Sequence, residues 1–164
     1  MKPYLRVLAI DPGYRNFAFC SIDNFNYLNP HKWQHEDLWK GRKGTPSRTE
    51  LMEMMNDWCS RNQEELAKAD VIVVERQMRK PFIAMECFIV GRYYHKTKVV
   101  HAATVGKFWG LPGTREQKKA VGISRCMEAG LEFPDVDKQD DLADAWLMAM
   151  RYICLYGGVD KKTL

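Results

Sequence analysis

Four consecutive β-branched residues, the run Val71–Val74, constrain the fold of this chain more than any other feature of its sequence. Such a run suits a strand that is buried on both faces, as in the middle of a parallel sheet. An earlier apolar run over residues 4–10 predicts a second strand. The intervening sequence holds a turn signal at Asp11-Pro12-Gly13 and an apolar stripe at helical spacing, so we predict an α/β layer fold.

The other elements are predicted from turn residues, capping patterns and apolar periodicity. Ser47 and Glu50 match a capping box, which predicts the start of a helix. In chain order we expect strands over residues 4–10, 16–23 and part of 25–35, a basic loop over 40–47, a helix from about 45 or 47 to 66, a strand over 71–74, a helix over 82–95, a strand over 98–101, helices over 103–108, 115–129 and 138–156, and a loop at 110–114. These elements predict a single domain over residues 1–164, since a domain typically holds ~150 residues.

Composition excludes several classes of protein. With 46% hydrophobic and 28% charged residues, the chain is too apolar for a disordered protein and too charged for a membrane protein. No stretch approaches the ~20 apolar residues of a membrane span, and we expect no secretory signal. The five cysteines are scattered and contain no C-x-x-C pair, which predicts an intracellular, reducing compartment and no disulfide framework.

Two of the predicted strands each lead directly into an acid, Asp11 and Glu75. An acid beside a buried strand is unfavourable unless it is paired or bound to a metal. If the two strands are parallel and adjacent, both carboxylates emerge at the same edge of the sheet, where ligand sites of α/β sheets lie. Taken alone, either acid could equally begin a turn.

The predicted final helix adds acids three and four positions apart, which share a helix face. Asp140 can be explained by the helix macrodipole, whereas Asp144 lies in an apolar stretch and is expected to point inward. Carboxylates without well-placed Cys or His ligands suit Mg²⁺ or Mn²⁺. Two such ions ~3.5–4 Å apart can activate a water and stabilise the leaving oxygen in phosphodiester hydrolysis.

Positively charged residues fall around these acids in the sequence, which fits a phosphate backbone as the ligand; an ordinary solvated surface is the alternative. They are Arg76, Arg79, Lys80, Lys96, Lys98, Lys107, Arg115, Lys118 and Lys119. His31 and His35 stand four positions apart, but they lack the H-E-x-x-H pattern of a zinc site. We therefore expect these histidines in a surface loop or an edge strand.

Four motifs in this order resemble a RuvC-type Holliday junction resolvase of the ribonuclease H-like superfamily: Asp11-Pro-Gly-x-x-Asn, Val-Val-Glu75, the segment from Lys107 to Lys118, and Asp141-x-x-Asp144-Ala. The resemblance covers nearly the whole chain. The stretch Glu75-Arg-Gln is more similar to the poxviral and fungal mitochondrial branches than to the bacterial branch. The resemblance implies a central mixed five-stranded sheet flanked by helices.

The resemblance also implies an activity. The expected protein is a Mg²⁺-dependent endonuclease that resolves four-way DNA junctions during recombination, repair or genome processing, by paired symmetric nicks that leave 5′-phosphates. The implied site comprises the metal ligands Asp11, Glu75, Asp141 and Asp144, with Lys118 and Lys107 near the scissile phosphate. From the charge pattern, we predict that DNA is bound by Arg76, Arg79, Lys80, Lys107, Arg115, Lys118 and Lys119. Alternatives are a related nuclease acting on RNA or an RNA–DNA hybrid, and a protein that binds junctions without cutting them.

Three points stay open at the level of the sequence. The first is whether Asp140 or Asp141 is the acid that corresponds to the metal ligand of the family. The second is which residue opens the junction, Met78 or Phe82. The family acts as a two-fold symmetric dimer, which matches the two like strands of a junction. The apolar helix at 82–95 is our candidate for the dimer interface, with a fully buried core helix as the equal alternative.

Overall fold

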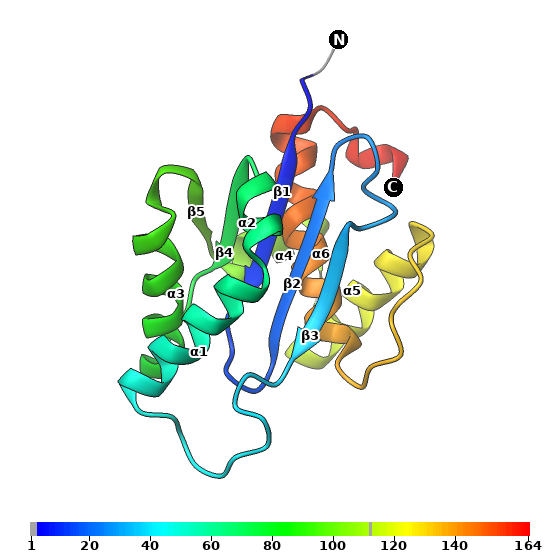
Figure 1. Cartoon of the computed structure of the whole chain (residues 1–164). Helices are drawn as coiled ribbons and strands as arrows, with labels where there is room; N and C mark the ends of the chain where they lie inside the picture. The colour runs from blue at the N-terminus through cyan, green and yellow to red at the C-terminus, as the bar shows by residue number, and fades with distance from the viewer. Residues whose placement is uncertain (1–2, 112) are drawn as a thin grey trace.

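A computed structural model describes residues 3–111 and 113–164; position 112 of the predicted loop at 110–114 therefore lies outside the described residues. Its centre is a five-stranded mixed sheet with the strand order β3-β2-β1-β4-β5 (Figure 1). The strands are β1 (Arg6–Asp11), β2 (Phe17–Asp23), β3 (Lys32–Glu36), β4 (Val71–Glu75) and β5 (Thr97–Val100). β1 pairs antiparallel with β2 and parallel with β4, and β4 pairs parallel with β5. The predicted mixed sheet is confirmed.

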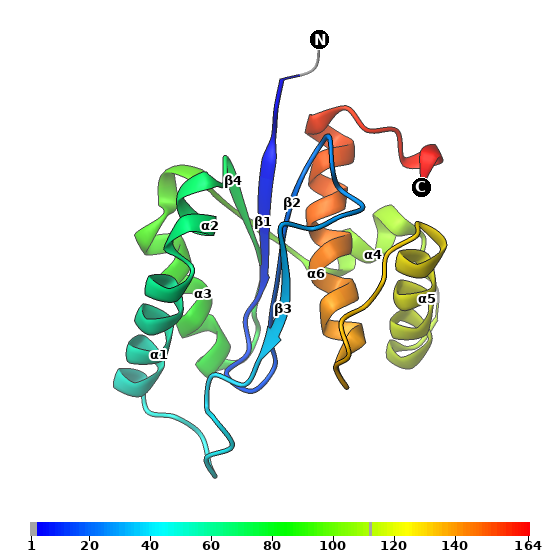
Figure 2. The same cartoon turned by 45° about the vertical axis from the view of Figure 1, so that its right-hand side comes forward.

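Helices cover both faces of the sheet, so each face has its own hydrophobic core (Figure 2). One face carries α1 (Arg48–Arg61), α2 (Gln63–Lys68) and α3 (Lys80–Arg92), and the other carries α4 (Ala102–Trp109), α5 (Arg115–Glu128) and α6 (Gln139–Tyr152). Successive strand residues point to opposite faces. Leu8 and Ile10 accordingly lie in the core beside α1, and Val7 and Ala9 lie in the core beside α6.

Several helix boundaries differ from those predicted. The capping box of Ser47 and Glu50 is present, but the helix that it opens breaks at Asn62. The Asn62 amide donates to the Trp58 carbonyl at 2.9 Å and accepts from Lys32 of β3 at 2.5 Å. The final α-helix ends at Tyr152 and continues as a π-helical turn over Ile153–Gly157. None of the helices in the described part of the chain has the length and hydropathy needed to cross a membrane.

The predicted helix over 82–95 is α3, which begins at Lys80 and ends at Arg92, followed by a 3-10 turn over Tyr94–Lys96. Its start includes Pro81, which is tolerated in the first helical turn because the missing N–H has no partner there. Met85 and Ile89 are fully buried, whereas Ile83 is 38% exposed. The interpretation of α3 as a fully buried core helix is therefore wrong.

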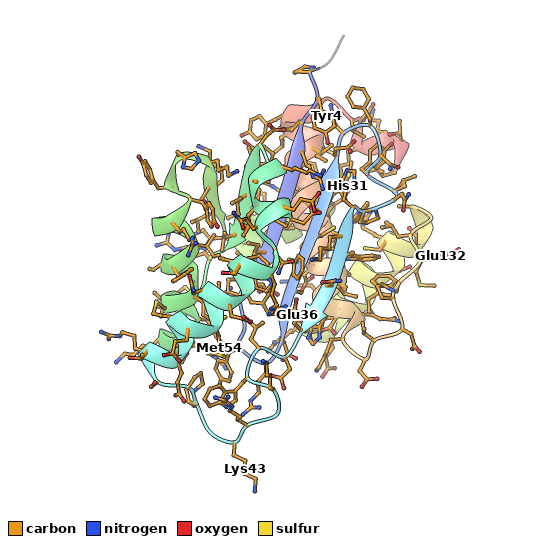
Figure 3. The ribbon with its side chains drawn as sticks, in the orientation of Figure 1. Tyr4, His31, Glu36, Lys43, Met54 and Glu132 are labelled. Atoms are coloured by element: carbon orange, nitrogen blue, oxygen red, sulfur yellow. The ribbon has the colours of Figure 1, made fainter. Side chains whose placement is uncertain are left out.

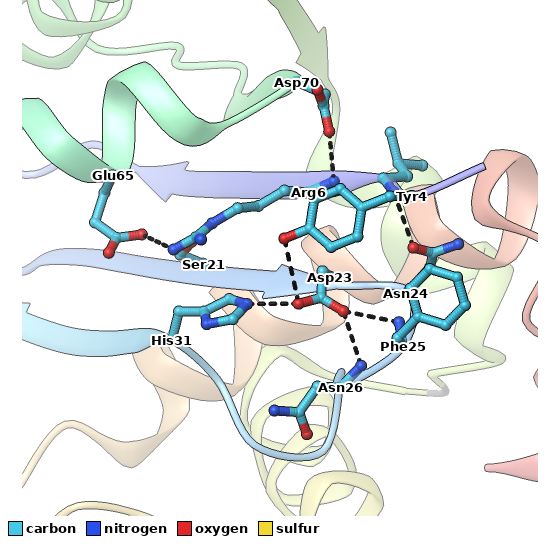
Figure 4. A network of polar contacts seen from close by, with 11 residues as sticks. Tyr4, Arg6, Ser21, Asp23, Asn24, Phe25, Asn26, His31, Glu65 and Asp70 are labelled. Carbon is cyan, nitrogen blue, oxygen red and sulfur yellow. Dashed lines mark hydrogen bonds and ion pairs between the residues drawn. The ribbon is translucent and has the colours of Figure 1, made fainter.

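A polar network closes the end of the sheet at which β1 begins (Figure 4). The Asp23 carboxylate accepts from the backbone N–H groups of Phe25 and Asn26 at 2.8 and 2.9 Å, and it lies 2.6 Å from His31 Nε2. These contacts shape the connection between β2 and β3. His31 thus has a structural position, and it lies in the upper part of Figure 3 near Tyr4, far from Lys43 at the bottom.

Candidate active site

β1 and β4 end side by side, and each ends on an acid. Ile10 pairs with Val74, so Asp11 and Glu75 come next at the same end of neighbouring parallel strands. The residues two positions earlier in both strands belong to the core beside α6. Because side chains along a strand alternate between faces, both carboxylates are directed to the α6 side of the sheet.

The turn after β1 is tight at Gly13. A Cβ atom at this position would lie 2.7 Å from the carbonyl oxygen of Asn16, a separation that real Cβ atoms do not adopt. Glycine therefore allows the chain to reverse within a few residues and to begin β2 at Phe17. The result is that Asp11 stays at the edge of the sheet with a short, close-packed turn above it.

α6 brings the other carboxylates to the same place. One oxygen from each of Asp11, Asp141 and Asp144 lies within 4.8 Å of the other two, and all three residues are half-buried. The Trp33 indole N–H donates to the Leu142 carbonyl at 2.8 Å, which fixes the first turn of α6 against β3. Three convergent carboxylates form an oxygen donor set of the kind that hard divalent cations prefer.

Glu75 lies in the same cleft but outside this group of three oxygens. Its charge nevertheless acts on the group, since it contributes to the raised pKa values of both Asp11 and Asp144. The pKa of Glu75 is itself raised by burial and by repulsion from Asp141, against a lowering hydrogen bond from Gln77. The structure thus brings three of the four predicted ligands together and places the fourth beside them.

The electrostatics of the cluster favour a bound cation. Burial, followed by repulsion from Glu75, Asp141 and Asp140, raises the pKa of Asp144 to about 7. Burial and the neighbouring carboxylates also raise the pKa of Asp11 well above its usual value. Both effects oppose the charged forms of these acids, and a divalent cation among their oxygens would relieve them. The residues present therefore fit a divalent metal site.

Lys119 distinguishes the two consecutive acids of α6, Asp140 and Asp141, because it pairs with only the first of them. This lysine of α5 forms an ion pair with Asp140. Although burial acts to raise the pKa of Asp140, the hydrogen bond from Lys119 holds it below its usual value. Asp140 thus pairs with an amine, while Asp141 joins Asp11 and Asp144.

A cleft of about 930 Å³ opens from the acidic cluster, and positive side chains line it. The predicted residues in this lining are Arg76, Arg79, Lys107, Arg115, Lys118 and Lys119. Lys80 is exposed at the start of α3 and is not part of the lining. Lys96 has a structural position instead, because its ammonium donates to the carbonyls of Leu66 and Ala69 at 2.6 and 2.9 Å.

Most of the chain matches one known protein family. Residues 6–156 match the family described as Poxvirus A22 protein. The chain belongs to the poxvirus A22 protein family. The resemblance to RuvC-type resolvases, expected from the motifs around Asp11, Glu75 and Asp144, is thereby confirmed in its poxviral branch.

Curated relatives of this A22 family member come from monkeypox, vaccinia and variola viruses. A protein named resolvase OPG149, from monkeypox virus, is 30% identical over 115 residues, which cover 62% of this chain and 58% of the relative. A protein named Holliday junction resolvase, from vaccinia virus strain Ankara, is 31% identical over 114 residues, which cover 59% of this chain and 58% of the relative. The match therefore spans less than two thirds of the length of these relatives.

Solved structures share the fold of this A22 family member. The yeast mitochondrial Holliday junction resolvase Ydc2 gives a TM-score of 0.62 at 18% identity, over 96% of this chain and 84% of that protein. The fowlpox virus Holliday junction resolvase gives 0.61 at 18% identity, over 92% and 99%. RuvC of Thermus thermophilus gives 0.60 at 14% identity, over 93% and 97%. These likenesses show the predicted ribonuclease H-like fold.

One residue beside the acidic cluster of this A22 family member escaped the sequence-based prediction. His35 lies in the edge strand β3, as expected, but its Nε2 atom is 3.6 Å from Asp141 Oδ2 and 3.3 Å from Asn16 Oδ1. It stands two positions after Trp33, so both residues face α6. The edge-strand prediction for His35 is confirmed, but its position beside Asp141 was not predicted, and strand alternation from Trp33 is the signal that identifies this neighbourhood.

Proposed function

We propose that this protein is a Mg²⁺-dependent endonuclease that resolves four-way DNA junctions by paired symmetric nicks. The observation that carries the proposal is the convergence of Asp11, Asp141 and Asp144 at one end of a cleft lined by positive side chains. A negative site surrounded by positive charge suits a phosphate backbone bridged by metal ions. Membership of the poxvirus A22 protein family, and similarity to proteins of monkeypox and vaccinia viruses that are named resolvases, support the choice of substrate.

The metal ligands in this proposal are Asp11, Glu75, Asp141 and Asp144. We infer two Mg²⁺ ions, with Mn²⁺ as a substitute, because a set made only of carboxylates selects hard cations. When bound, such ions supply an activated water and stabilise the leaving oxygen in phosphodiester hydrolysis. The chain itself contributes the fixed positions of these carboxylates, which come from two strand ends and one helix.

The positive side chains of the cleft would hold the DNA and its developing charge. Lys118 and Lys107 line the cleft with the acids and would stabilise negative charge on the scissile phosphate, an effect worth ~3 kcal/mol by analogy with oxyanion donors. We assign Arg76, Arg79, Lys80, Arg115 and Lys119 to flanking phosphates.

In the reaction, the water oxygen bonds to phosphorus and the bond to the 3′ oxygen breaks, which leaves a 5′-phosphate and a 3′-hydroxyl.

Met78 is our choice for the residue that opens the junction. Its side chain is 82% exposed and lines the cleft three positions after Glu75. Phe82 instead packs against Tyr14 with a ring-centroid separation of 5.5 Å. An exposed apolar side chain is free to enter between base pairs and unstack them, whereas Phe82 is already held by its contact.

We further infer a homodimer that associates through the outer face of α3, where Ile83 is exposed. A two-fold dimer places two equivalent sites against the two like strands of a junction.

We also propose that the chain forms one nuclease domain over residues 1–164 in an intracellular, reducing compartment. The free state of the five cysteines supports this compartment.

The substrate is tested by incubating the protein and Mg²⁺ with a synthetic mobile four-way junction and, in parallel, with an RNA–DNA hybrid duplex. We expect paired nicks at symmetric positions on opposing strands of the junction, mapped on a sequencing gel, and little cleavage of the hybrid. Preferential cleavage of the hybrid would replace this proposal with a ribonuclease activity. Binding of the junction without any cleavage would indicate a protein that only recognises junctions.

The site is tested with Asp144→Asn. This variant removes one metal ligand while keeping the shape of the side chain, so we expect junction binding to persist and nicking to fall at least about 1,000-fold. Asp57→Asn, an exposed aspartate of α1 that pairs with Arg61, is the matched control and should nick like the parent protein. Nicking by Asp144→Asn at the rate of this control would remove Asp144 from the site.

A further inference from the structure

The basic loop, residues 40–47, lies outside the cleft and takes no part in the function proposed above. It connects β3 to α1 and projects from the end of the sheet at which β1 ends (Figure 1). Lys40, Arg42 and Lys43 are all exposed, and Lys43 at the tip points away from the body of the protein (Figure 3). The loop therefore presents three positive charges beyond the end of the molecule that carries the acidic cluster.

The basic loop is attached to the turn that follows Asp11. The Arg15 guanidinium, which lines the cleft, donates to the carbonyls of Arg42 at 2.6 Å and Gly44 at 3.0 Å. Just before the loop, the backbone N–H of Trp39 donates to the Tyr14 carbonyl at 2.9 Å. Arg15 thus connects the cleft to the loop. A long anionic ligand that extends out of the cleft past Arg15 would reach the positive charges of the loop.

Internal contacts hold the loop in a defined shape. The Asp37 carboxylate accepts from the backbone N–H groups of Trp39 and Gly41 at 2.9 and 2.8 Å. Trp39 is buried, and the Arg42 guanidinium lies 5.0 Å from the centre of its ring. Lys40 and Lys43, by contrast, have no ion-pair partner within residues 3–111 and 113–164. Their two ammonium groups are available to a ligand.

The charged residues around the loop determine on which side of it an anionic ligand binds more favourably. A groove of about 480 Å³ between the loop and α1 is lined by five acids and three basic residues, namely Glu36, Asp37, Glu50, Glu53 and Asp57, and Lys40, Arg42 and Arg61. Because acids outnumber basic residues in this groove, it is less favourable for an anionic strand than the route from the cleft, where Arg15 offers positive charge. Charge complementarity therefore directs a polyanion along the Arg15 side of the loop.

We infer that the basic loop binds the phosphate backbone of a duplex arm of the junction, outside the cleft. This inference rests on the function proposed above. A junction arm continues as duplex beyond the branch point, and the loop lies outside the cleft of about 930 Å³ in which we place the scissile phosphate. Contacts of lysine and arginine with phosphates supply affinity and fix orientation without reading sequence. The loop thus extends the DNA-binding surface and orients one arm.

The test is the salt dependence of junction binding by the double variant Lys40→Gln/Lys43→Gln. Each lost phosphate contact lowers the slope of log K against log salt by about 0.9, so we expect the slope to fall by about 1.8. At 0.1 M salt the dissociation constant should rise about tenfold or more. Fluorescence anisotropy with a labelled four-way junction in EDTA measures both quantities, since no cleavage is expected without a divalent cation.

The matched control is Lys68→Gln/Lys162→Gln, which removes the same charge from exposed positions that do not line the cleft. It should keep the slope of the parent protein. Single-turnover nicking at saturating protein should be unchanged in the loop variant, because its lysines do not touch the reacting phosphate. Equal slopes and affinities for the loop variant and the control would overturn this inference alone. Failure of the parent protein to bind or nick the junction would overturn the proposed function and this inference with it.

Discussion

Asp144 is one of the acids whose charge the fold opposes, because burial and nearby carboxylates raise its pKa to about 7. Its ordinary pKa is close to 3.9, so the folded state binds a proton more tightly than the unfolded state. The resulting stabilisation is fully present at low pH and is lost as the pH rises through about 7. Without metal, we therefore predict that the free energy of unfolding falls between about pH 4 and pH 7.

The variant Asp144→Asn should remove much of this dependence. One pKa unit corresponds to about 1.4 kcal/mol, and 1 kcal/mol shifts Tm by about 2–4 °C in a protein of this size. At pH 8 in EDTA, we expect Asp144→Asn to raise Tm by about 5 °C or more, with little change at pH 4. Thermal unfolding followed by circular dichroism measures this. A Tm at pH 8 no higher than that of Asp57→Asn would contradict the raised pKa.

At the scale of single elements, α3 has two different faces. Met85 and Ile89 anchor it to the core, while Ile83 stays exposed on the outer side. In the proposed dimer, Ile83→Glu places a charge in an apolar interface, so we expect the dissociation constant of the dimer to rise at least about 100-fold. Sedimentation velocity reports the change. Met127→Glu, at an exposed apolar position of α5, is the control. Equal dissociation constants of the dimer for the two variants would rule out this face of α3 as the interface.

The elements also show which parts of the fold are readable from the sequence. The buried strands β1 and β4 were predictable because each is a short apolar run that ends on an acid, a purely local pattern. The break at Asn62 was not, because it depends on a hydrogen bond from Lys32, thirty positions away in another strand. The position of His35 beside Asp141 likewise depends on the packing of α6 against β3, which a spacing rule does not contain.

At the scale of the whole molecule, the sheet separates two cores, and the candidate site lies where one strand pair and α6 meet. Parallel register and side-chain alternation suffice to predict that Asp11 and Glu75 share an edge with the acids of α6. They do not predict which carboxylate oxygens lie closest together: those of Asp11, Asp141 and Asp144 lie within 4.8 Å of one another, with Glu75 beside them in the same cleft. The pairing of Asp140 with Lys119 is equally a product of how α5 packs on α6.

The central claim is that the carboxylates of Asp11, Asp141 and Asp144 together hold a divalent cation. Titration of the metal-free protein with Mn²⁺, followed by the loss of the electron paramagnetic resonance signal of free Mn²⁺, tests it most directly. We predict saturable binding by the parent protein and by Asp57→Asn, and binding weakened at least about tenfold in both Asp11→Asn and Asp144→Asn. Binding of Mn²⁺ by these two variants with the affinity of the parent protein, or no saturable binding by the parent at millimolar Mn²⁺, would contradict the account.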